Sequence, residues 1–181
     1  TRIVYITGDG RYLLQGKLVD LETRTEITED RLSELKMAVL SQVGDDSMVV
    51  YAPEDPKHTV TVFTDIDCGF CRRMHADMEQ YHKQGIAIRY LFYPRAGVGS
   101  DSYTKAVSVW CADDRHAAMD TAKAGESVPV KTCENPVASH YELGQQMSIS
   151  GTPALVLSDG EIVPGYVPPD KLRRALDQRF P

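Results

Sequence analysis

Two cysteines separated by two residues, Cys68 and Cys71, are the side chains in this sequence with the clearest capacity for chemistry. Their spacing suits a dithiol that is oxidised and reduced reversibly, and it also supplies half of the ligands of a structural zinc site. Such a zinc site needs a second close pair of ligands, which neither the cysteines at 111 and 133 nor the histidines at 58, 75, 82, 116 and 140 supply. We therefore predict a redox-active pair and no metal.

The pair lies where a predicted strand gives way to a predicted helix. At a helix start, unpaired backbone N–H groups and the positive end of the helix dipole favour a thiolate over a thiol, so we expect the pKa of Cys68 to be lowered. Cys71 lies one turn further along and is expected to be less exposed. Cys68 is therefore the predicted nucleophile and Cys71 the predicted resolving thiol.

Charged residues beside the pair have opposing effects on the stability of a cysteine thiolate. Asp65 and Asp67 precede it and disfavour a thiolate, whereas Arg72 and Arg73 partly compensate. The two arginines are most simply interpreted as a solvated face near the site. His75, one turn beyond the second cysteine, is a candidate for tuning the thiolates, and a packed or exposed histidine is the alternative.

A proline at the start of a later predicted strand is the second candidate feature. Pro153 precedes the apolar residues 154–157, and a proline there cannot donate to a central strand ladder. In isolation it indicates an ordinary turn, but with the cysteine pair upstream we predict a cis Thr152–Pro153 bond. That bend leaves the Thr152 backbone free to pair with an extended substrate beside Cys68. The predicted substrate-binding residues are Thr152, Pro153, Gly69 and Phe70.

The two remaining cysteines, Cys111 and Cys133, enclose residues 112–132. Four cysteines allow three pairings if all are oxidised, and their spacing does not choose among them. A loop of this length suits a structural bridge, and two buried free thiols are the alternative.

A strand, helix, strand order surrounds the dithiol. The β-branched run 60–64 predicts a strand, a helix follows from Gly69 to Gly85, and residues 86–93 predict a second strand. The residues expected on the buried face of the helix are Phe70, Met74, Met78 and Tyr81. This order is typical of a βαβ unit with two parallel strands.

The rest of the C-terminal part is predicted from the same patterns. Residues 100–147 have helical periodicity, and residues 154–163 form a hairpin around Asp159 and Gly160. Pro169 opens a last helix. The residues expected on its inner face are Leu172, Ala175 and Leu176.

The first 43 residues predict a hairpin and a helix. Residues 4–6 and 12–14 predict two short strands on either side of a turn at Asp9 and Gly10. A lone hairpin is barely stable in water, so this one must pack on its own chain or on another copy. Thr28 is the predicted cap of a helix over 28–43. The apolar residues expected to face the core are Leu32, Leu35 and Val39.

Composition narrows the class of protein. The chain has 181 residues, 42% of them hydrophobic, and a net charge of −6, which excludes a disordered chain and makes nucleic acid an unexpected partner. No stretch has the ~18 apolar residues of a membrane span. The first residues, Thr1 and Arg2, do not begin an export signal, so we expect that any such signal has been removed or never existed.

Several segments together carry a family resemblance: 4–10 with 15–16, 62–71, 89–91 with 94–95, 110–112, 150–154, and 163–166 with 168–169. They include Cys-Gly-Phe-Cys at 68–71 and Ser-Gly-Thr-Pro at 150–153. The sequence resembles the thioredoxin superfamily and, within it, the DsbC/DsbG family of periplasmic thiol:disulfide interchange proteins. It departs from the usual family pattern at Phe70 and Asp67, where members usually have Tyr and Thr.

The resemblance implies an α/β, thioredoxin-like fold with a helical insertion at about 100–147. The domains it implies are a partial N-terminal β-rich dimerisation domain (1–27), a linker helix (28–46) and a catalytic domain (47–181). It also implies that Cys68 and Cys71 are the redox-active pair, that Pro153 is the cis proline, and that Cys111 and Cys133 form a structural disulfide.

The activity implied is that of a periplasmic protein disulfide isomerase and reductase with chaperone activity. It needs no cofactor, acts on misfolded secreted proteins as a homodimer, and is kept reduced by the membrane reductase DsbD. The alternatives are a DsbG-like reductase of sulfenylated cysteines, a DsbA-like oxidase, and a binding module with a secondary redox pair. Gly69, where DsbG-like members more often have proline, argues against the first, and the N-terminal hairpin and linker helix argue against the second.

Overall fold

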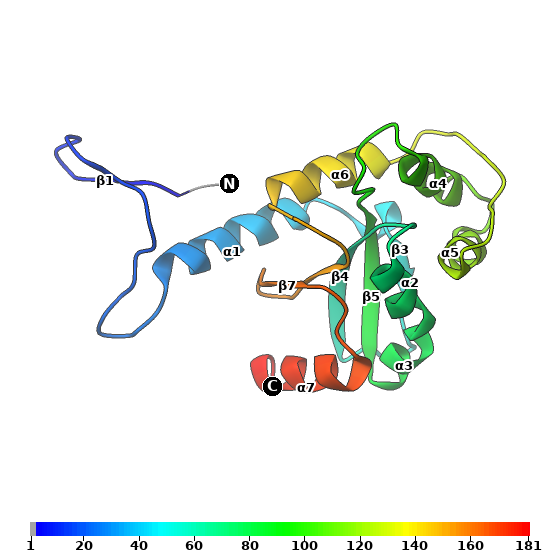
Figure 1. Cartoon of the computed structure of the whole chain (residues 1–181). Coiled ribbons are helices and arrows are strands. Elements are labelled where there is room, and N and C mark those ends of the chain that lie inside the picture. The colour runs from blue at the N-terminus through cyan, green and yellow to red at the C-terminus, as the bar shows by residue number, and fades with distance from the viewer. Residues whose placement is uncertain (1–2) are drawn as a thin grey trace.

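A five-stranded mixed sheet organises most of the chain in the computed structural model, which describes residues 3–181 (Figure 1). Thr1 and Arg2, at the start of the predicted N-terminal domain, lie outside the described residues. The strands, in the spatial order β3-β5-β4-β6-β7, are β3 (Val49–Tyr51), β5 (Ile86–Phe92), β4 (His58–Thr64), β6 (Ala154–Val156) and β7 (Ile162–Pro164). Only β4 and β5 are parallel among these pairs, with Val62 opposite Tyr90, which confirms the predicted βαβ unit.

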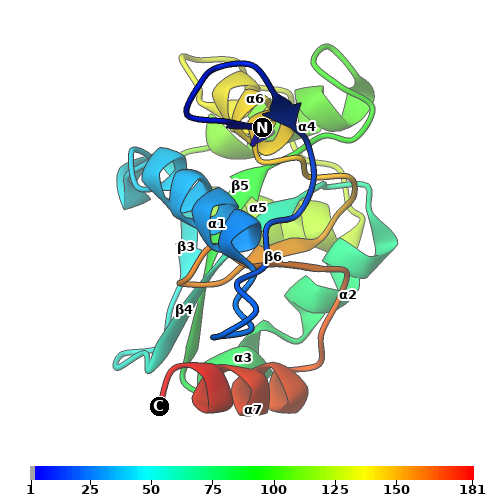
Figure 2. The same ribbon diagram turned by 90° about the vertical axis from the view of Figure 1, so that its left-hand side faces the viewer.

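Helices cover both faces of this sheet (Figure 1 and Figure 2). The helices are α1 (Ile27–Leu40), α2 (Gly69–Ala76), α3 (Met78–Lys83), α4 (Asp101–Trp110), α5 (Arg115–Ala124), α6 (Val137–Gln146) and α7 (Pro169–Arg179), with a short 3-10 turn at Asp45–Ser47. Buried residues of α2, α3, α4, α5 and α7 join one apolar cluster. Leu40 of α1 and Leu143 of α6 join the other cluster, although Val137 at the start of α6 belongs to the first, so the domain has three layers.

The central strand β4 shows why its sequence is apolar at successive positions. Val62 belongs to the first cluster and Phe63 to the second, because neighbouring side chains of a strand point to opposite faces. Both faces are covered, and residues 60–64 are all buried. A continuous β-branched and aromatic run is typical of such a two-sided strand.

The helix predicted after the dithiol is divided at Asp77 into α2 and α3. The Asp77 carboxylate accepts a hydrogen bond from the Tyr166 hydroxyl at 2.5 Å. The prediction that Phe70 lies on the buried face is wrong, since this residue is 62% exposed, because the inner face of α2 is formed by Cys71 and Met74. In α7, Leu172 and Leu176 are buried as predicted, but Ala175 is exposed because α7 covers the sheet along a narrow stripe.

The predicted helical insertion contains α4, α5 and α6. Ser100 and Asp114 cap the first two helices through side-chain oxygens that accept backbone N–H groups. In α6, Gly144 allows close approach to the sheet, because a Cβ there would lie 2.5 Å from ring atoms of Tyr93. No helix within residues 3–181 combines the length and hydrophobicity needed to cross a membrane.

The N-terminal hairpin consists of β1 (Tyr5–Ile6) and β2 (Leu13–Leu14), which pair antiparallel. Figure 1 shows it beyond the far end of α1, away from the sheet. The prediction that Thr28 caps this helix is wrong, because the helix begins at Ile27 and Thr28 lies buried in its first turn. Its hydroxyl contacts the Tyr5 hydroxyl at 2.5 Å and accepts the Leu18 N–H at 2.7 Å, which ties the hairpin segment to the helix.

The apolar stripe of α1 is less buried than its spacing predicts. Leu35 is 48% exposed, and Leu32 and Val39 are only half-buried. The helix also ends at Leu40 rather than at residue 43. It packs into the core only at that end, where Leu40 meets Met48 in the second cluster, so the rest of the stripe borders an open groove.

Candidate active site

Cys68 and Cys71 lie at the start of α2, just beyond the C-terminal end of β4. Cys68 is the N-cap residue, and its carbonyl oxygen accepts the Arg72 N–H at 3.0 Å. Both cysteines are free thiols, with exposed fractions of 3% and 1%. The two sulfurs are thus not bonded to each other in this structure, and little of either residue reaches the surface.

The chain returns to the dithiol at Thr152 and Pro153. The bond between these two residues is cis, and the thiol of Cys68 donates a hydrogen bond to the Thr152 carbonyl oxygen at 3.2 Å. Strand β6 starts directly afterwards and pairs with β4, so Ala154 lies opposite Phe63. This pairing brings the proline loop against the start of α2.

The two thiols have shifted pKa values in opposite directions. Burial acts to raise the pKa of Cys68, but hydrogen bonds from Thr152 and Cys71 and the charge of Arg95 outweigh it, so the pKa is lowered. The pKa of Cys71 is raised, chiefly by burial, although the charge of Lys123 acts against that rise. Cys68 is therefore the stronger candidate for the thiolate that attacks.

The two acidic residues before the pair do not act as isolated negative charges. Asp65 is buried, and one carboxylate oxygen accepts both the backbone N–H and the Nε–H of Arg95 at 3.0 Å. Asp67 forms ion pairs with Lys105 at 2.8 Å and with Arg72 at 3.2 Å. These pairs limit the opposition to a thiolate that the sequence alone predicts from Asp65 and Asp67.

The other two positive candidates contact different partners. The Arg73 guanidinium lies over the Tyr166 ring, 4.9 Å from its centroid. The ring nitrogens of His75 contact the Tyr90 hydroxyl at 3.4 Å and Asp120 at 3.0 Å, and burial lowers its pKa. His75 thus belongs to a polar cluster behind the dithiol.

Sequence reasoning missed two residues of this site, Arg95 and Lys123. The position of Arg95 in the sequence could have indicated it, because Arg95 follows β5. Strands β4 and β5 are parallel, so their C-terminal ends lie at the same edge of the sheet. Lys123 lies four residues after the buried Met119 and directly after the buried Ala122, so helical spacing also placed it on the inner face of α5.

Gly69 and Phe70 lie between the cysteines at the surface of the first turn of α2. Phe70, two residues after Cys68, is largely exposed. The four predicted substrate-binding residues thus come from two segments, the start of α2 and the proline loop, which the fold brings together.

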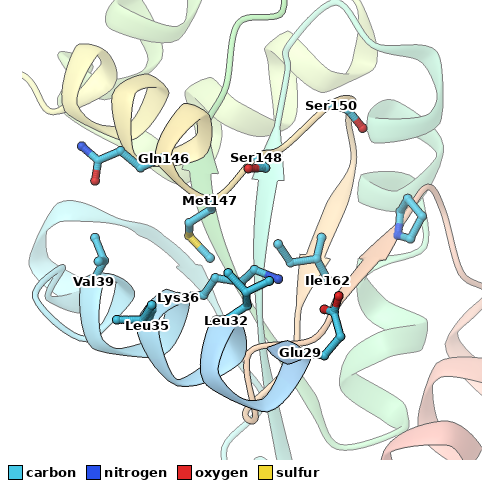
Figure 3. Close-up of a pocket in the computed structure, with 11 residues that line it drawn as sticks. Glu29, Leu32, Leu35, Lys36, Val39, Gln146, Met147, Ser148, Ser150 and Ile162 are labelled. Carbon is cyan, nitrogen blue, oxygen red and sulfur yellow. The ribbon is translucent and has the colours of Figure 1, made fainter. Parts of the chain in front are cut away.

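A groove of about 500 Å³ borders the proline loop (Figure 3). It lies between α1 and the segment that follows α6, and it ends near Ser150, two residues before Thr152. Its apolar lining residues are Leu32, Leu35, Val39, Met147, Ile162 and Pro164. Glu29 and Lys36 also line it.

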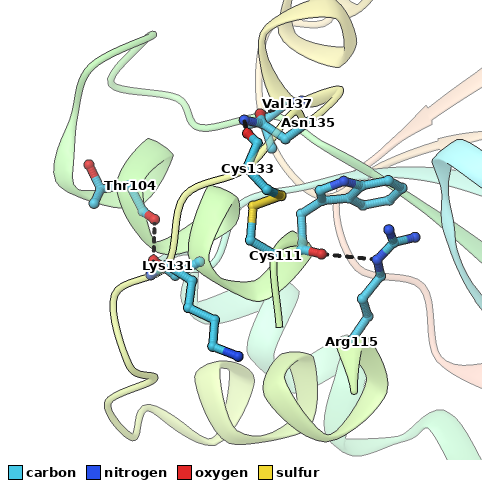
Figure 4. The surroundings of a disulfide bond; sticks show 9 residues. Thr104, Cys111, Arg115, Lys131, Cys133, Asn135 and Val137 are labelled. Atoms are coloured by element: carbon cyan, nitrogen blue, oxygen red, sulfur yellow. Dashed lines mark hydrogen bonds between the residues drawn. A yellow bond between two sulfur atoms is a disulfide. The ribbon is translucent and has the colours of Figure 1, made fainter. Parts of the chain in front are cut away.

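The structure contains a disulfide bond between Cys111 and Cys133, with an S–S distance of 2.01 Å (Figure 4). It joins the end of α4 to the segment before α6. Nearby, Arg115 donates to the Trp110 carbonyl at 2.9 Å and stacks over the indole ring. This bridge lies within the helical insertion and is separate from the dithiol.

Within residues 3–181, no group of three or more His, Cys, Asp or Glu side chains converges as metal ligands would.

Family models match two parts of the chain. Residues 45–180 match the thioredoxin-like domain, and residues 1–29 match the disulfide bond isomerase protein N-terminal domain.

Named relatives match nearly the whole chain. The thiol:disulfide interchange protein DsbC of Dickeya dadantii is 42% identical over 181 residues, which cover 97% of this chain and 72% of that protein. The DsbC protein of Escherichia coli (strain K12) is 40% identical over 176 residues, with 97% and 73% covered.

Solved structures share the fold. A disulfide interchange protein from Neisseria gonorrhoeae superposes with a TM-score of 0.64 and 32% identity, covering 74% of this chain and 97% of that one. The α-DsbA2 protein of Wolbachia pipientis, at 17% identity and a TM-score of 0.65, shares the fold alone. The domain matches and the extent of identity establish that this chain belongs to the DsbC family of thiol:disulfide interchange proteins, which are disulfide isomerases with a thioredoxin-like fold.

Proposed function

We propose that this protein rearranges incorrect disulfide bonds in secreted proteins in the periplasm, with Cys68 as the attacking thiolate and Cys71 as the resolving thiol. One observation carries the assignment of roles. The Cys68 sulfur has the lowered pKa and contacts the Thr152 carbonyl beside the cis proline, whereas Cys71 is more deeply buried and has the raised pKa.

In the proposed reaction, the Cys68 thiolate attacks one sulfur of a substrate disulfide and releases the other as a thiolate. The product is a mixed disulfide between Cys68 and the substrate. A second substrate thiolate then attacks that bond and releases Cys68, which completes isomerisation without net oxidation. Alternatively, Cys71 attacks Cys68, the substrate leaves reduced, and the enzyme holds an oxidised Cys68–Cys71 pair.

Substrate backbone is proposed to pair with the proline loop. The Thr152 carbonyl accepts the Cys68 thiol in the reduced state, and loss of that proton leaves the oxygen available to a substrate N–H. Pro153 holds the loop in place, since its own carbonyl accepts the Gly165 N–H at 2.8 Å. Gly69 leaves the approach to the sulfur open, and the exposed Phe70 ring supplies an apolar contact.

The N-terminal domain (1–27), joined by the linker helix (28–46) to the catalytic domain (47–181), is proposed to form a homodimer. The hairpin exposes Ile6, Leu13 and Leu14, and an isolated two-stranded hairpin is barely stable in water. A second copy of the chain covers such a surface, and the match of residues 1–29 to an isomerase N-terminal domain supports this assignment. Chaperone activity then arises from apolar surfaces, including the groove near Ser150, that face unfolded clients.

A reducing partner is required because the Cys71 reaction leaves the pair oxidised. We assign this role to the membrane reductase DsbD, which returns two electrons through thiol–disulfide exchange at Cys68. The periplasmic location is supported by the Cys111–Cys133 disulfide, since stable structural disulfides are typical of oxidising compartments.

The test is reactivation of a scrambled multi-disulfide protein, run beside oxidation of the same protein in its fully reduced form. We expect fast unscrambling by the parent chain and none by Cys68→Ser. Fast oxidation without unscrambling would overturn the isomerase assignment. A Cys68→Ser/Cys71→Ser variant that still suppresses client aggregation separates chaperone activity from redox chemistry. Faster reduction of a sulfenylated protein than of a scrambled one identifies the DsbG-like alternative.

A further inference from the structure

A lysine is buried directly behind the dithiol. Lys123 of α5 is 3% exposed, and α5 packs against α2. Its Nζ donates hydrogen bonds to the Thr64 hydroxyl at 2.6 Å and to the Asp65 carbonyl at 2.9 Å. A buried ammonium without a hydrogen-bonded counter-ion is costly, so this position calls for an explanation.

The contacts of Lys123 suit a neutral amine. A neutral amine has two N–H donors, which Thr64 and the Asp65 carbonyl satisfy, and one lone pair that can accept a proton. An ammonium has a third N–H donor. Beyond the two oxygen acceptors, the structure describes a contact of Nζ with the Tyr90 ring, whose centroid is 5.7 Å away. Burial lowers the pKa of Lys123 to about 8.

Lys123 and Cys71 are coupled electrostatically. Among the charges that raise the pKa of Lys123, a Cys71 thiolate has the largest effect. In turn, the positive charge of Lys123 has the largest effect among the influences that lower the pKa of Cys71. The other titratable and charged groups around the amine are Cys68, Arg72 and His75 of α2, Asp65 after β4, and Tyr90 of β5.

The other groups near Lys123 that could accept a proton already form hydrogen bonds. The Asp65 carboxylate is occupied by Arg95 and by the Asp67 N–H, and the His75 nitrogens contact Tyr90 and Asp120. Arginine does not give up its proton in proteins, which excludes Arg72 as a base. Lys123 therefore has both the position and the unused lone pair.

We propose that Lys123 is the proton acceptor for Cys71 when Cys71 resolves the mixed disulfide, a role that rests on the proposed functions of Cys68 and Cys71. The Cys71 S–H bond breaks and its proton moves to Nζ, either directly or through one water. The thiolate of Cys71 then attacks the Cys68 sulfur, the Cys68–Cys71 bond forms, and the substrate leaves as a thiolate that takes its proton from solvent. The ammonium of Lys123 returns its proton to solvent or to Cys71 when the enzyme is reduced again.

The experiment is stopped-flow reaction of the reduced full chain with an excess of 5,5′-dithiobis(2-nitrobenzoate). Attack by Cys68 releases one thionitrobenzoate anion in a phase whose rate depends on reagent concentration. Resolution by Cys71 releases the second anion in a phase that is independent of concentration. The leaving anion needs no proton, so the second phase reports only the formation and attack of the Cys71 thiolate.

For the parent chain we expect the second-phase rate to rise with pH and to level off near pH 8. Lys123→Met removes the base, so the rate at pH 7 should fall at least about tenfold, in line with the usual contribution of a general base. In that variant the rate should continue to rise beyond pH 9, because Cys71 then ionises at its own raised pKa. Lys123→Gln is the second variant, since its amide still donates hydrogen bonds but does not accept the proton.

Lys131→Met is the matched control, because Lys131 is partly exposed and pairs with Asp113. Its second phase should match that of the parent. An unchanged second-phase rate and pH profile in both Lys123 variants, with a normal first phase, would overturn the role of Lys123. Loss of the first phase in the parent chain would instead overturn the role proposed for Cys68. Equal slowing of both phases would assign Lys123 a structural role only.

Discussion

The sulfur of Cys68 lies 3.2 Å from the carbonyl oxygen of Thr152, although 84 residues separate the two in the sequence. The thiol donates a hydrogen bond to the backbone group that is proposed to bind substrate. Loss of the thiol proton therefore creates the nucleophile and frees the carbonyl in the same event. This contact connects activation of the sulfur with recognition of an extended substrate.

Thr152→Val should raise the pKa of Cys68. Hydrogen bonding by Thr152 lowers this pKa, and its buried hydroxyl, which has no other hydrogen-bond partner among the described residues, is available to donate to the sulfur once the thiol proton is lost. A hydrogen bond to a charged group is stronger than one to a neutral group, so its loss should move the midpoint of thiolate absorbance to higher pH. Thr152→Ser should restore it, and Thr104→Val, on the exposed face of α4, should leave it unchanged. An equal midpoint in parent and Thr152→Val would contradict this role.

Arg95→Met should lower stability and raise the pKa of Cys68. The substitution leaves the buried Asp65 carboxylate without its cation, which should reduce the free energy of unfolding by about 1–3 kcal/mol in urea titrations. Asp65→Asn in the same chain removes the stranded charge and should recover most of the loss. Arg174→Met breaks an exposed pair with Asp170 and should cost less than about 0.5 kcal/mol. A double variant as unstable as Arg95→Met would exclude this explanation.

Removal of the Cys111–Cys133 bridge should destabilise the folded chain. The two cysteines are 22 residues apart, and a cross-link of that length lowers the entropy of the unfolded chain enough to contribute about 3 kcal/mol. Thermal unfolding of Cys111→Ala/Cys133→Ala should show a lower melting temperature, whereas the first phase of the dithiol reaction should be unchanged. An unaltered melting temperature would show that the bridge does not limit the unfolded state.

The pH dependence of stability should reveal the buried lysine. Burial lowers the pKa of Lys123 from 10.5 to about 8, so folding releases a proton between these values and the free energy of unfolding rises with pH there. The difference corresponds to about 3 kcal/mol, which disfavours the folded state fully below pH 8 and disappears above pH 10.5. Lys123→Met lacks this dependence.

Urea unfolding of parent and Lys123→Met at pH 7 and pH 10 measures that difference. The parent should gain about 2–3 kcal/mol relative to the variant between the two pH values. Both chains carry Cys71→Ser in this comparison, because Lys123 lowers the pKa of Cys71 and the titration of that thiol would otherwise differ between them. Parallel pH profiles would show that Lys123 keeps an ordinary pKa in the folded state.

Local patterns predicted much of this fold. The β-branched run before Cys68 and the helical spacing after it predicted β4 and α2, because strand and helix periodicities are properties of neighbouring residues. The hairpin turns at Asp9 and Asp159 were predictable for the same reason. The limits of α1 and the division at Asp77 were not, because tertiary contacts such as the Tyr166 hydroxyl bond decide them.

The site divides in the same way. By itself the sequence determined the chemistry available, a dithiol at a helix start and a proline at a strand start, since both depend on residue type and local position. Only the tertiary structure decided which groups act on the sulfurs. The order β5-β4-β6 places Arg95 and Thr152 on either side of Cys68, and packing of α5 on α2 buries Lys123 behind Cys71. Burial and long-range pairing set the protonation of a thiol, and both arise from contacts between segments that lie far apart in the chain.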